Sequence, residues 1–453
     1  MRADLIVAAV AFLARALVLV WAAGRFPPTA DGSYYHTIAS RIAEGLGSTW
    51  LWPDGKVTYA AHYPVGYPAL LALVYRVTGP TVVAAGWLNA LLGTAGSVAA
   101  YRLAAGATRP RLALLAGLAV ALHPALVLYT PAIMTEGVTA ALVVIAAWLA
   151  SLRSTRATVA LGITLGIATL VRPQSLLLAP CLGFLAAGAA WRARARHAAI
   201  ATSIAVAVCL PWTFRNCMRM NQCALVSFNG GWNLLIGAHE HATGTFAPLE
   251  VPEPCRTVWD EAEKDACFGR EARAIVARDP GRWLALVPAK LAATFDYSGA
   301  PGFYLHQSNG EAFGYDAKRL LGIVETAYER FAYLGALFVA AFVPGPFRRA
   351  RWVVAGVSGA LLFQTHAYLS VLGLAVTLAL SRKRLVDGPT LWGATFAVLA
   401  TTLLAHAVFF GSGRYAMVVF PLVTALALSV TGRADGEGDA LVVARDGRLG
   451  QKD

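Results

Sequence analysis

One carboxylate in the first polar stretch of the chain stands where it could act as a base. Asp31 begins the segment 31–47, whose apolar residues recur at helical spacing on one face: Tyr35, Ile38, Ala39, Ile42 and Leu46. Such a helix, following a membrane span, lies in the membrane interface with its apolar face down. Asp31 would then be a general base at the membrane–water boundary, or a helix N-cap worth about 1 kcal/mol. Spacing alone favours the cap.

A second acid, Glu136, stands where the chain re-enters the membrane after Pro131. A carboxylate at the boundary of a span is costly unless it is paired, so a functional role is the first hypothesis. Glu136 could orient an acceptor or pair with a cation such as Arg172. The alternative is a structural cap on the following helix, for which Thr135 competes.

The piece Asn229-Gly230-Gly231-Trp232-Asn233 combines a tight turn with side chains that suit a sugar. Paired glycines permit the turn, while Trp232, Asn229 and Asn233 could stack on a sugar and hydrogen-bond to it. The residue types alone favour a turn packed on the scaffold. His123, His366 and His406 are isolated, so no histidine metal site is expected. No cofactor is predicted, and a divalent metal stays possible without a ligand cluster to support it.

The composition shows which elements must position these residues. The chain has 453 residues, of which 57% are hydrophobic and only 14% charged, with a mean hydropathy of +0.57. Soluble domains are less apolar and more charged, so lipid is the solvent for much of this chain. Apolar stretches reach the length that spans a bilayer, and we predict an all-α polytopic protein with about 12 transmembrane helices. They are 5–23, 81–105, 111–126, 136–152, 157–171, 175–190, 198–214, 327–343, 352–367, 368–381, 390–409 and 415–431.

The net charge of +13 is distributed in a way that argues against nucleic acid as a partner. Basic residues gather in short gaps between apolar stretches, and no basic–aromatic recognition pattern appears. Short loops rich in Lys and Arg stay on the cytoplasmic side, and with the N-terminus inside every such cluster falls there. The clusters lie near residues 109, 153, 192–196, 348–351 and 382–384.

This threading predicts four regions. Residues 1–214 form an N-terminal transmembrane core that includes an outside loop, 25–80, with amphipathic juxtamembrane helices. Residues 215–326 form a long extracytoplasmic loop of mixed structure, with a charged helix near 258–278 and an apolar piece, 283–295, along the surface. Residues 327–431 form C-terminal transmembrane helices, and 432–453 a disordered cytoplasmic tail.

Four cysteines fall in the long outside loop, where disulfides can persist. They are Cys217, Cys223, Cys255 and Cys267. Pairing of sequence neighbours, Cys217 with Cys223 and Cys255 with Cys267, is one of three possible patterns. Four free thiols are the alternative.

Several motifs, in order along the chain, resemble those of GT-C glycosyltransferases. The first outside loop carries Asp31, Tyr34 and Tyr35 before an amphipathic helix, and then Tyr63-Pro64-Val65-Gly66-Tyr67-Pro68. Later pieces are Pro131 to Glu136, Arg172-Pro173, Pro211-Trp212 with Arg215-Asn216, Ser227 to Leu234, and Gly413-Arg414-Tyr415. The nearest groups are protein O-mannosyltransferase-like and aminoarabinose-transferase-like enzymes. The ordered set, rather than any one motif, carries the resemblance.

The resemblance implies a transferase that moves a hexose or pentose from a polyprenyl-phosphate carrier on the outer face of a plasma membrane, with inversion. In the family an acid of the first loop is the catalytic base, which matches Asp31. Many members carry a second acid next to it, where this chain has Gly32. Tyr34, Tyr35, Glu136 and the 229–233 piece would serve the acceptor, which could be a glycan, a lipid or a protein.

The leaving phosphate needs positive charge, which Arg supplies well. Five basic residues are expected at or near the outer boundary, where the charge rule makes them unusual: Lys56, His62, Arg172, Arg215 and Arg414. Arg414 and Arg172 are favoured by the motif match. For each of them the alternative is snorkelling to lipid headgroups.

Two other functions compete. A transporter or lipid flippase would show paired repeats, broken spans and charges at the midplane. A non-catalytic subunit could keep the fold without activity, and Gly32 in place of an acid keeps that reading open.

Overall fold

The computed structural model describes residues 3–429, which are mostly α-helical. Four helices are long and apolar enough to cross a membrane: α1 (Ala3–Ala22), α4 (Val82–Ala105), α10 (Trp191–Arg219) and α20 (Thr390–Val408). Further helices complete the bundle: α5 (Pro110–Ala121), α6 (Pro124–Leu128), α7 (Thr135–Ser151), α8 (Thr155–Val171), α9 (Leu178–Leu185), α16 (Tyr315–Phe342), α17 (Arg348–Leu361), α18 (Ala367–Leu380), α19 (Arg382–Asp387) and α21 (Phe420–Ala427). The all-α, multi-pass membrane class is confirmed. The number of about 12 spans stays a prediction.

Small residues let the helices approach closely. A Cβ atom on Gly162 of α8 would lie 2.9 Å from the backbone oxygen of Ala201 in α10, and one on Gly166 would lie 3.0 Å from that of Ala205. Larger residues at either position would push the two helices apart. This contact holds the C-terminal end of α8, where Arg172 follows.

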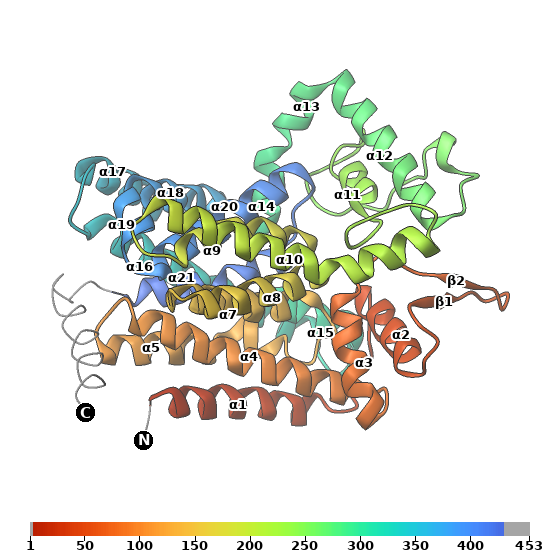
Figure 1. Ribbon diagram of the computed structural model, residues 1–453, viewed down its shortest axis with the longest axis horizontal. Coiled ribbons are helices and arrows are strands. Elements are labelled where there is room, and N and C mark those ends of the chain that lie inside the picture. The colour runs from red at the N-terminus through yellow and green to blue at the C-terminus, as the bar shows by residue number, and fades with distance from the viewer. Residues whose placement is uncertain (1–2, 430–453) are drawn as a thin grey trace, which may run out of the picture.

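Loops that the charge pattern assigns to one side of the membrane meet at one end of the bundle. Arg194 forms a 2.8 Å ion pair with Asp387, and Arg153 donates a 3.1 Å hydrogen bond to the carbonyl oxygen of Gly388. Figure 1 shows α17 and α19 at this end, while α2, α3 and the two strands of the first outside loop lie at the opposite end together with α11 and α12 of the long loop.

The first outside loop contains two helices separated by a hairpin. Helix α2 (Asp31–Ala43) buries Tyr35, Ile38 and Ala39, the face expected from the spacing, and α3 (Gly66–Thr78) leads into α4. Between them β1 (Thr49–Leu51) pairs antiparallel with β2 (Val57–Tyr59), with Trp50 opposite Thr58. Sequence reasoning missed this hairpin. Its signal is the turn Pro53-Asp54-Gly55, in which Gly55 has a φ of +84°.

The long loop contains one longer helix, α12 (Glu261–Arg278), and four short ones: α11 (Gly230–Ile236), α13 (Pro280–Ala285), α14 (Val287–Phe295) and α15 (Ala300–Ser308). Helix α12 lies in the segment expected to be a charged helix. Asp260 caps it by accepting hydrogen bonds of 3.0 Å from the backbone N–H groups of Ala262 and Glu263.

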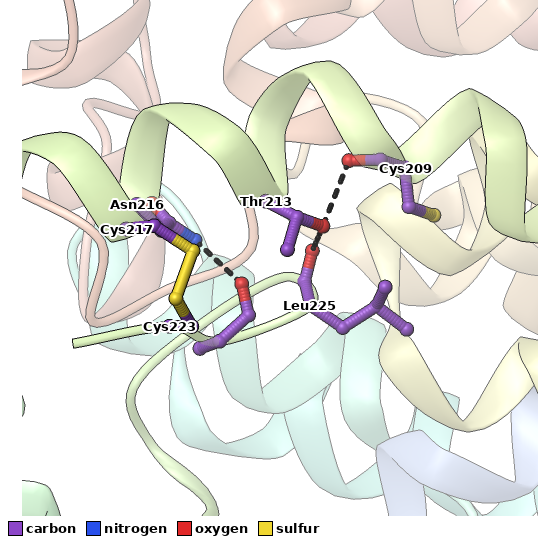
Figure 2. The surroundings of a disulfide bond; sticks show 7 residues. Cys209, Thr213, Asn216, Cys217, Cys223 and Leu225 are labelled. Atoms are coloured by element: carbon purple, nitrogen blue, oxygen red, sulfur yellow. Dashed lines mark hydrogen bonds between the residues drawn. A yellow bond between two sulfur atoms is a disulfide. The ribbon is translucent and has the colours of Figure 1, made fainter.

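Two disulfides brace this loop, in the pairing of sequence neighbours. Cys217 at the end of α10 is joined to Cys223, and Cys255 is joined to Cys267 of α12. Figure 2 shows the first of them, where the chain turns back along α10. There the side-chain amide of Asn216 donates to the carbonyl oxygen of Ala224 at 3.1 Å, and the Thr213 hydroxyl donates to that of Leu225 at 2.9 Å.

Some expected boundaries differ from the structure. The borders at 214/215 and 326/327 fall inside α10 and α16, because both helices continue with polar residues beyond their apolar stretches. The piece 283–295 does not lie wholly along the surface: α14 buries Leu291 and Phe295 and packs on α18 and α20. The predicted tail, 432–453, lies outside the described residues.

The long loop also holds the first loop in place. The backbone N–H of Phe228 donates to the carbonyl oxygen of Ala61 at 2.9 Å, and the N–H of Ala61 donates to the Glu261 carboxylate at 2.7 Å. Burial raises the pKa of Glu261 from its ordinary value of 4.5 to about 7, and the hydrogen bonds that it accepts only partly offset this effect.

This raised pKa predicts a pH-dependent stability. The folded state binds the Glu261 proton more tightly than the unfolded state does, so proton binding at Glu261 adds to the free energy of unfolding. This stabilisation is complete below a pH of about 4.5 and is lost as the pH rises through about 7. In melting-temperature scans in detergent, wild type should therefore lose stability over this range relative to Glu261→Gln. The control Glu263→Gln, at an exposed position on the same turn, should follow wild type. Parallel curves for wild type and Glu261→Gln would contradict this reading.

Candidate active site

A cavity of about 560 Å³ opens at the end of the bundle that carries the outside loops. Its walls come from segments far apart in sequence: the start of α2, the residues before α3, the first turn of α7, the end of α8, α11, the end of α20 and the 3-10 helix η3 (Gly413–Val418). Nine of the residues singled out from sequence line it: Asp31, Tyr35, His62, Glu136, Arg172, Asn229, Trp232, Asn233 and Arg414.

Asp31 does not cap α2. The N-cap residue is Ala30, and no side chain caps the helix. Instead one carboxylate oxygen of Asp31 accepts a 2.9 Å hydrogen bond from the Tyr63 hydroxyl, and the other accepts a 2.8 Å hydrogen bond from Arg414. The Asp31 side chain is 22% exposed, so it remains accessible from the cavity. The prediction that Asp31 caps the helix, which the spacing favoured, is therefore wrong.

Glu136 is almost fully buried, and its side chain is 2% exposed. One of its oxygens accepts a 2.8 Å hydrogen bond from Arg172 and lies 3.4 Å from Nε of Arg414. The other accepts a 3.3 Å hydrogen bond from the Tyr129 hydroxyl. A buried carboxylate is stable only when it is paired in this way. Among the sequence readings, pairing with Arg172 is present in the structure, whereas Glu136 does not cap α7.

The four charges therefore form one chain that runs from Asp31 to Arg414, on to Glu136 and then to Arg172. Opposite charges alternate along it, so each carboxylate faces at least one guanidinium. The hydrogen bonds that Arg172 donates all leave from Nη1, so Nε and Nη2 remain available to an anion.

An aromatic support orients both guanidinium groups. Arg172 lies over the ring of Tyr415 at 4.8 Å and Arg414 at 5.2 Å. The buried His406 stacks on Tyr415 with a centroid distance of 4.4 Å, and its Nδ1 lies 2.9 Å from the carbonyl oxygen of Phe410. The Tyr415 ring is thus held by His406 of α20, and it in turn supports the guanidinium groups of Arg172 and Arg414.

Three of the sequence-based candidates lie elsewhere. Lys56 is on the β1–β2 hairpin and Tyr34 stacks on Trp50, and both line a second cavity rather than this one. Arg215 donates a 2.7 Å hydrogen bond to the carbonyl oxygen of Ser48 and lies over the Trp212 ring at 4.6 Å. Of the five basic candidates, Lys56 and Arg215 are thus carried away from Asp31 by the hairpin and by α10.

The residue after Asp31 has a packing reason to be glycine. A Cβ atom on Gly32 would lie 2.9 Å from the backbone oxygen of Ile133 and 3.0 Å from the hydroxyl of Tyr304. A second acid does not fit there. Glu136, three residues beyond Ile133 in the chain, supplies the second carboxylate of the site instead.

Sequence reasoning missed Tyr63 and Tyr415 as site residues. Each is the neighbour of a residue that the sequence analysis did single out, His62 and Arg414 respectively, and both lie in the recognised motifs.

Residues 3–429 contain no group of three or more His, Cys, Asp or Glu side chains that could hold a metal ion. Between the two carboxylates of the site stands the guanidinium of Arg414.

Two solved structures and one family are similar to this chain. The chain resembles the oligosaccharyltransferase of Archaeoglobus fulgidus with a tethered acceptor peptide (15% identity, TM-score 0.49, covering 98% of this chain and 50% of that one). It also resembles ArnT of Cupriavidus metallidurans bound to undecaprenyl phosphate (14% identity, TM-score 0.39, covering 94% and 77%). The chain thus spans about half the length of the archaeal enzyme. No curated protein matches it.

Residues 62–214 match the family described as dolichyl-phosphate-mannose-protein mannosyltransferase. This segment includes His62, Tyr63, Glu136 and Arg172 of the site. The match confirms the resemblance to GT-C glycosyltransferases that the sequence motifs predicted.

Proposed function

We propose that this chain is a membrane glycosyltransferase that moves a sugar from a polyprenyl-phosphate carrier to an acceptor hydroxyl or amine. The observation that carries the proposal is the alternating chain of Asp31, Arg414, Glu136 and Arg172 in a cavity at the ends of the helices. It combines an accessible carboxylate with two guanidinium groups. The family match over residues 62–214 supports the same chemistry.

Asp31 is the proposed general base. The hydroxyl of an acceptor gives up its proton to the Asp31 carboxylate while its oxygen forms a bond to the anomeric carbon. The bond from that carbon to the phosphate oxygen breaks on the opposite side, so the configuration inverts. Tyr63 and Arg414 hold the carboxylate in place for this step, each through a hydrogen bond shorter than 3 Å.

Arg172 and Arg414 are the proposed phosphate ligands. The polyprenyl phosphate leaves with the electron pair of the broken bond and gains negative charge, which fixed guanidinium groups stabilise in a site of low dielectric. Glu136 and the Tyr415 ring keep both arginines aimed into the cavity, so little reorganisation is needed during the reaction. Glu136 is thus a positioning residue.

The proposed location of the site is the extracytoplasmic side of a plasma membrane. The two disulfides lie in the loop that forms part of the cavity wall, and disulfides persist in oxidising compartments. The basic loops lie at the other end of the bundle, as the charge rule requires of cytoplasmic loops.

The competing functions are less well supported. A transporter would place its site near the bilayer midplane at the interface of repeats, whereas this cavity lies among helix ends and loops. The reading as a non-catalytic subunit rested on the missing acid at Gly32. Glu136 provides a second carboxylate from α7, so that observation no longer favours it.

Asp31→Asn should abolish transfer and preserve the fold. Because the amide cannot accept the acceptor proton, we expect the turnover rate to fall by about 10²- to 10⁴-fold. The measurement is release of labelled sugar from a panel of polyprenyl-phosphate sugars by membranes that contain equal amounts of each protein. Asp316→Asn, at an exposed carboxylate in the first turn of α16, is the matched control and should behave as wild type. Equal turnover by the Asp31→Asn variant and wild type would remove Asp31 from the mechanism.

Arg414→Gln should weaken binding of the carrier. Losing charged hydrogen bonds to the phosphate should reduce the affinity for undecaprenyl phosphate by about tenfold to a hundredfold, and Arg414→Lys should restore part of it. Affinities are measured on purified protein in nanodiscs. Arg215→Gln is the control, because Arg215 lies outside the cavity. If Arg215→Gln weakens binding as strongly as Arg414→Gln, the phosphate is bound elsewhere.

A further inference from the structure

A second cavity lies beside the candidate active site. It measures about 970 Å³, at the upper end of the range for ligand pockets, and its walls are the β1–β2 hairpin and the start of α12. Figure 1 places both elements at the end of the molecule that carries the outside loops. The proposed transfer chemistry does not use this space.

Aromatic side chains with unusually high exposure face the second cavity. Trp259 is 86% exposed, Trp52 is 49% exposed and Tyr59 is 44% exposed. A single exposed aromatic residue needs no explanation, but several around one concave surface mark a binding site. Flat rings of this kind offer a surface to the C–H faces of a sugar, and the Trp52 ring is held in place by a 2.9 Å hydrogen bond from its indole N–H to the Thr58 hydroxyl.

The polar groups of the second cavity have mixed charge. Four carboxylates, those of Asp54, Asp260, Glu261 and Asp265, line it together with three cations, those of Lys56, Arg219 and Lys264. A site for a phosphate or another polyanion would carry an excess of positive charge, which is absent here. Carboxylates and amines that flank aromatic rings instead suit a neutral ligand rich in hydroxyl groups, since both can form hydrogen bonds to it.

Two residues connect the second cavity to the site. His62 and Trp232 line both cavities, and their rings lie 6.0 Å apart. The His62 ring also lies 4.7 Å from that of Tyr63, whose hydroxyl donates to Asp31. The two rings meet edge to face and form a wall common to both cavities, so the second cavity lies directly next to the one that holds the base.

We propose that the second cavity binds the acceptor and that the acceptor is a carbohydrate chain. Trp52 and Trp259 stack on its sugar rings, the carboxylates bind its hydroxyl groups, and its terminal sugar passes around the His62–Trp232 pair to present a hydroxyl to Asp31. This inference rests on the proposed function, of which it names the acceptor class.

The test is binding to arrays by the full chain in nanodiscs. One array carries neutral linear oligosaccharides of mannose, glucose, galactose and arabinose, and a second carries peptides rich in Ser and Thr. The variants are wild type, the double change Trp52→Ala with Trp259→Ala, and Trp191→Ala. Trp191 is 70% exposed at the start of α10 and lines neither cavity, so its removal controls for the loss of an exposed indole.

We expect wild type and Trp191→Ala to bind at least one oligosaccharide, and the double variant to lose about tenfold or more of this affinity. Absence of binding to every oligosaccharide, equal binding by all three proteins, or binding to peptides alone would each overturn the inference. Binding of undecaprenyl phosphate by wild type is measured on the same preparations. Its absence would count against the proposed function, while glycan binding that depends on the two tryptophans would still stand.

Discussion

The guanidinium of Arg414 between two carboxylates is the interaction on which the site depends. Asp31 and Arg414 are 383 positions apart in sequence, and Glu136 comes from a third element. Carboxylates that are removed from water repel one another and need a paired cation. Arg414 therefore joins η3, on which it lies, to the first loop and to α7. The Asp31 carboxylate nevertheless stays exposed to the cavity. The charge that holds the site together is also the charge that would receive a phosphate.

The fold brings these groups together through helix ends. Glu136 stands in the first turn of α7, where the helix dipole favours a negative charge, and Arg172 stands directly after α8. Glycines keep α8 close against α10, and the long loop fastens the first loop through Ala61. Function thus resides in loops and helix ends that a rigid apolar bundle supports, which is the usual division of roles.

Sequence alone was sufficient to find much of this site. Hydropathy identified a multi-pass membrane protein, and the cost of a charge at a membrane boundary singled out Glu136, while motifs singled out Asp31, Arg172 and Arg414. Charge patterns report the side of the membrane on which a residue lies, but not its lateral position. For that reason Lys56 and Arg215 could not be separated from Arg414 before the hairpin and the course of α10 were known. Likewise, spacing at the start of a helix could not distinguish a cap from a residue whose partner is distant in sequence.

The most direct test of the central claim is an experimental structure of the full chain in a nanodisc with undecaprenyl phosphate. The proposed mechanism requires the phosphate within hydrogen-bond distance of Arg172 and Arg414, with the Asp31 carboxylate facing the same cavity. A phosphate bound at the β1–β2 hairpin, or an Arg414 side chain turned away from both Asp31 and Glu136, would contradict it.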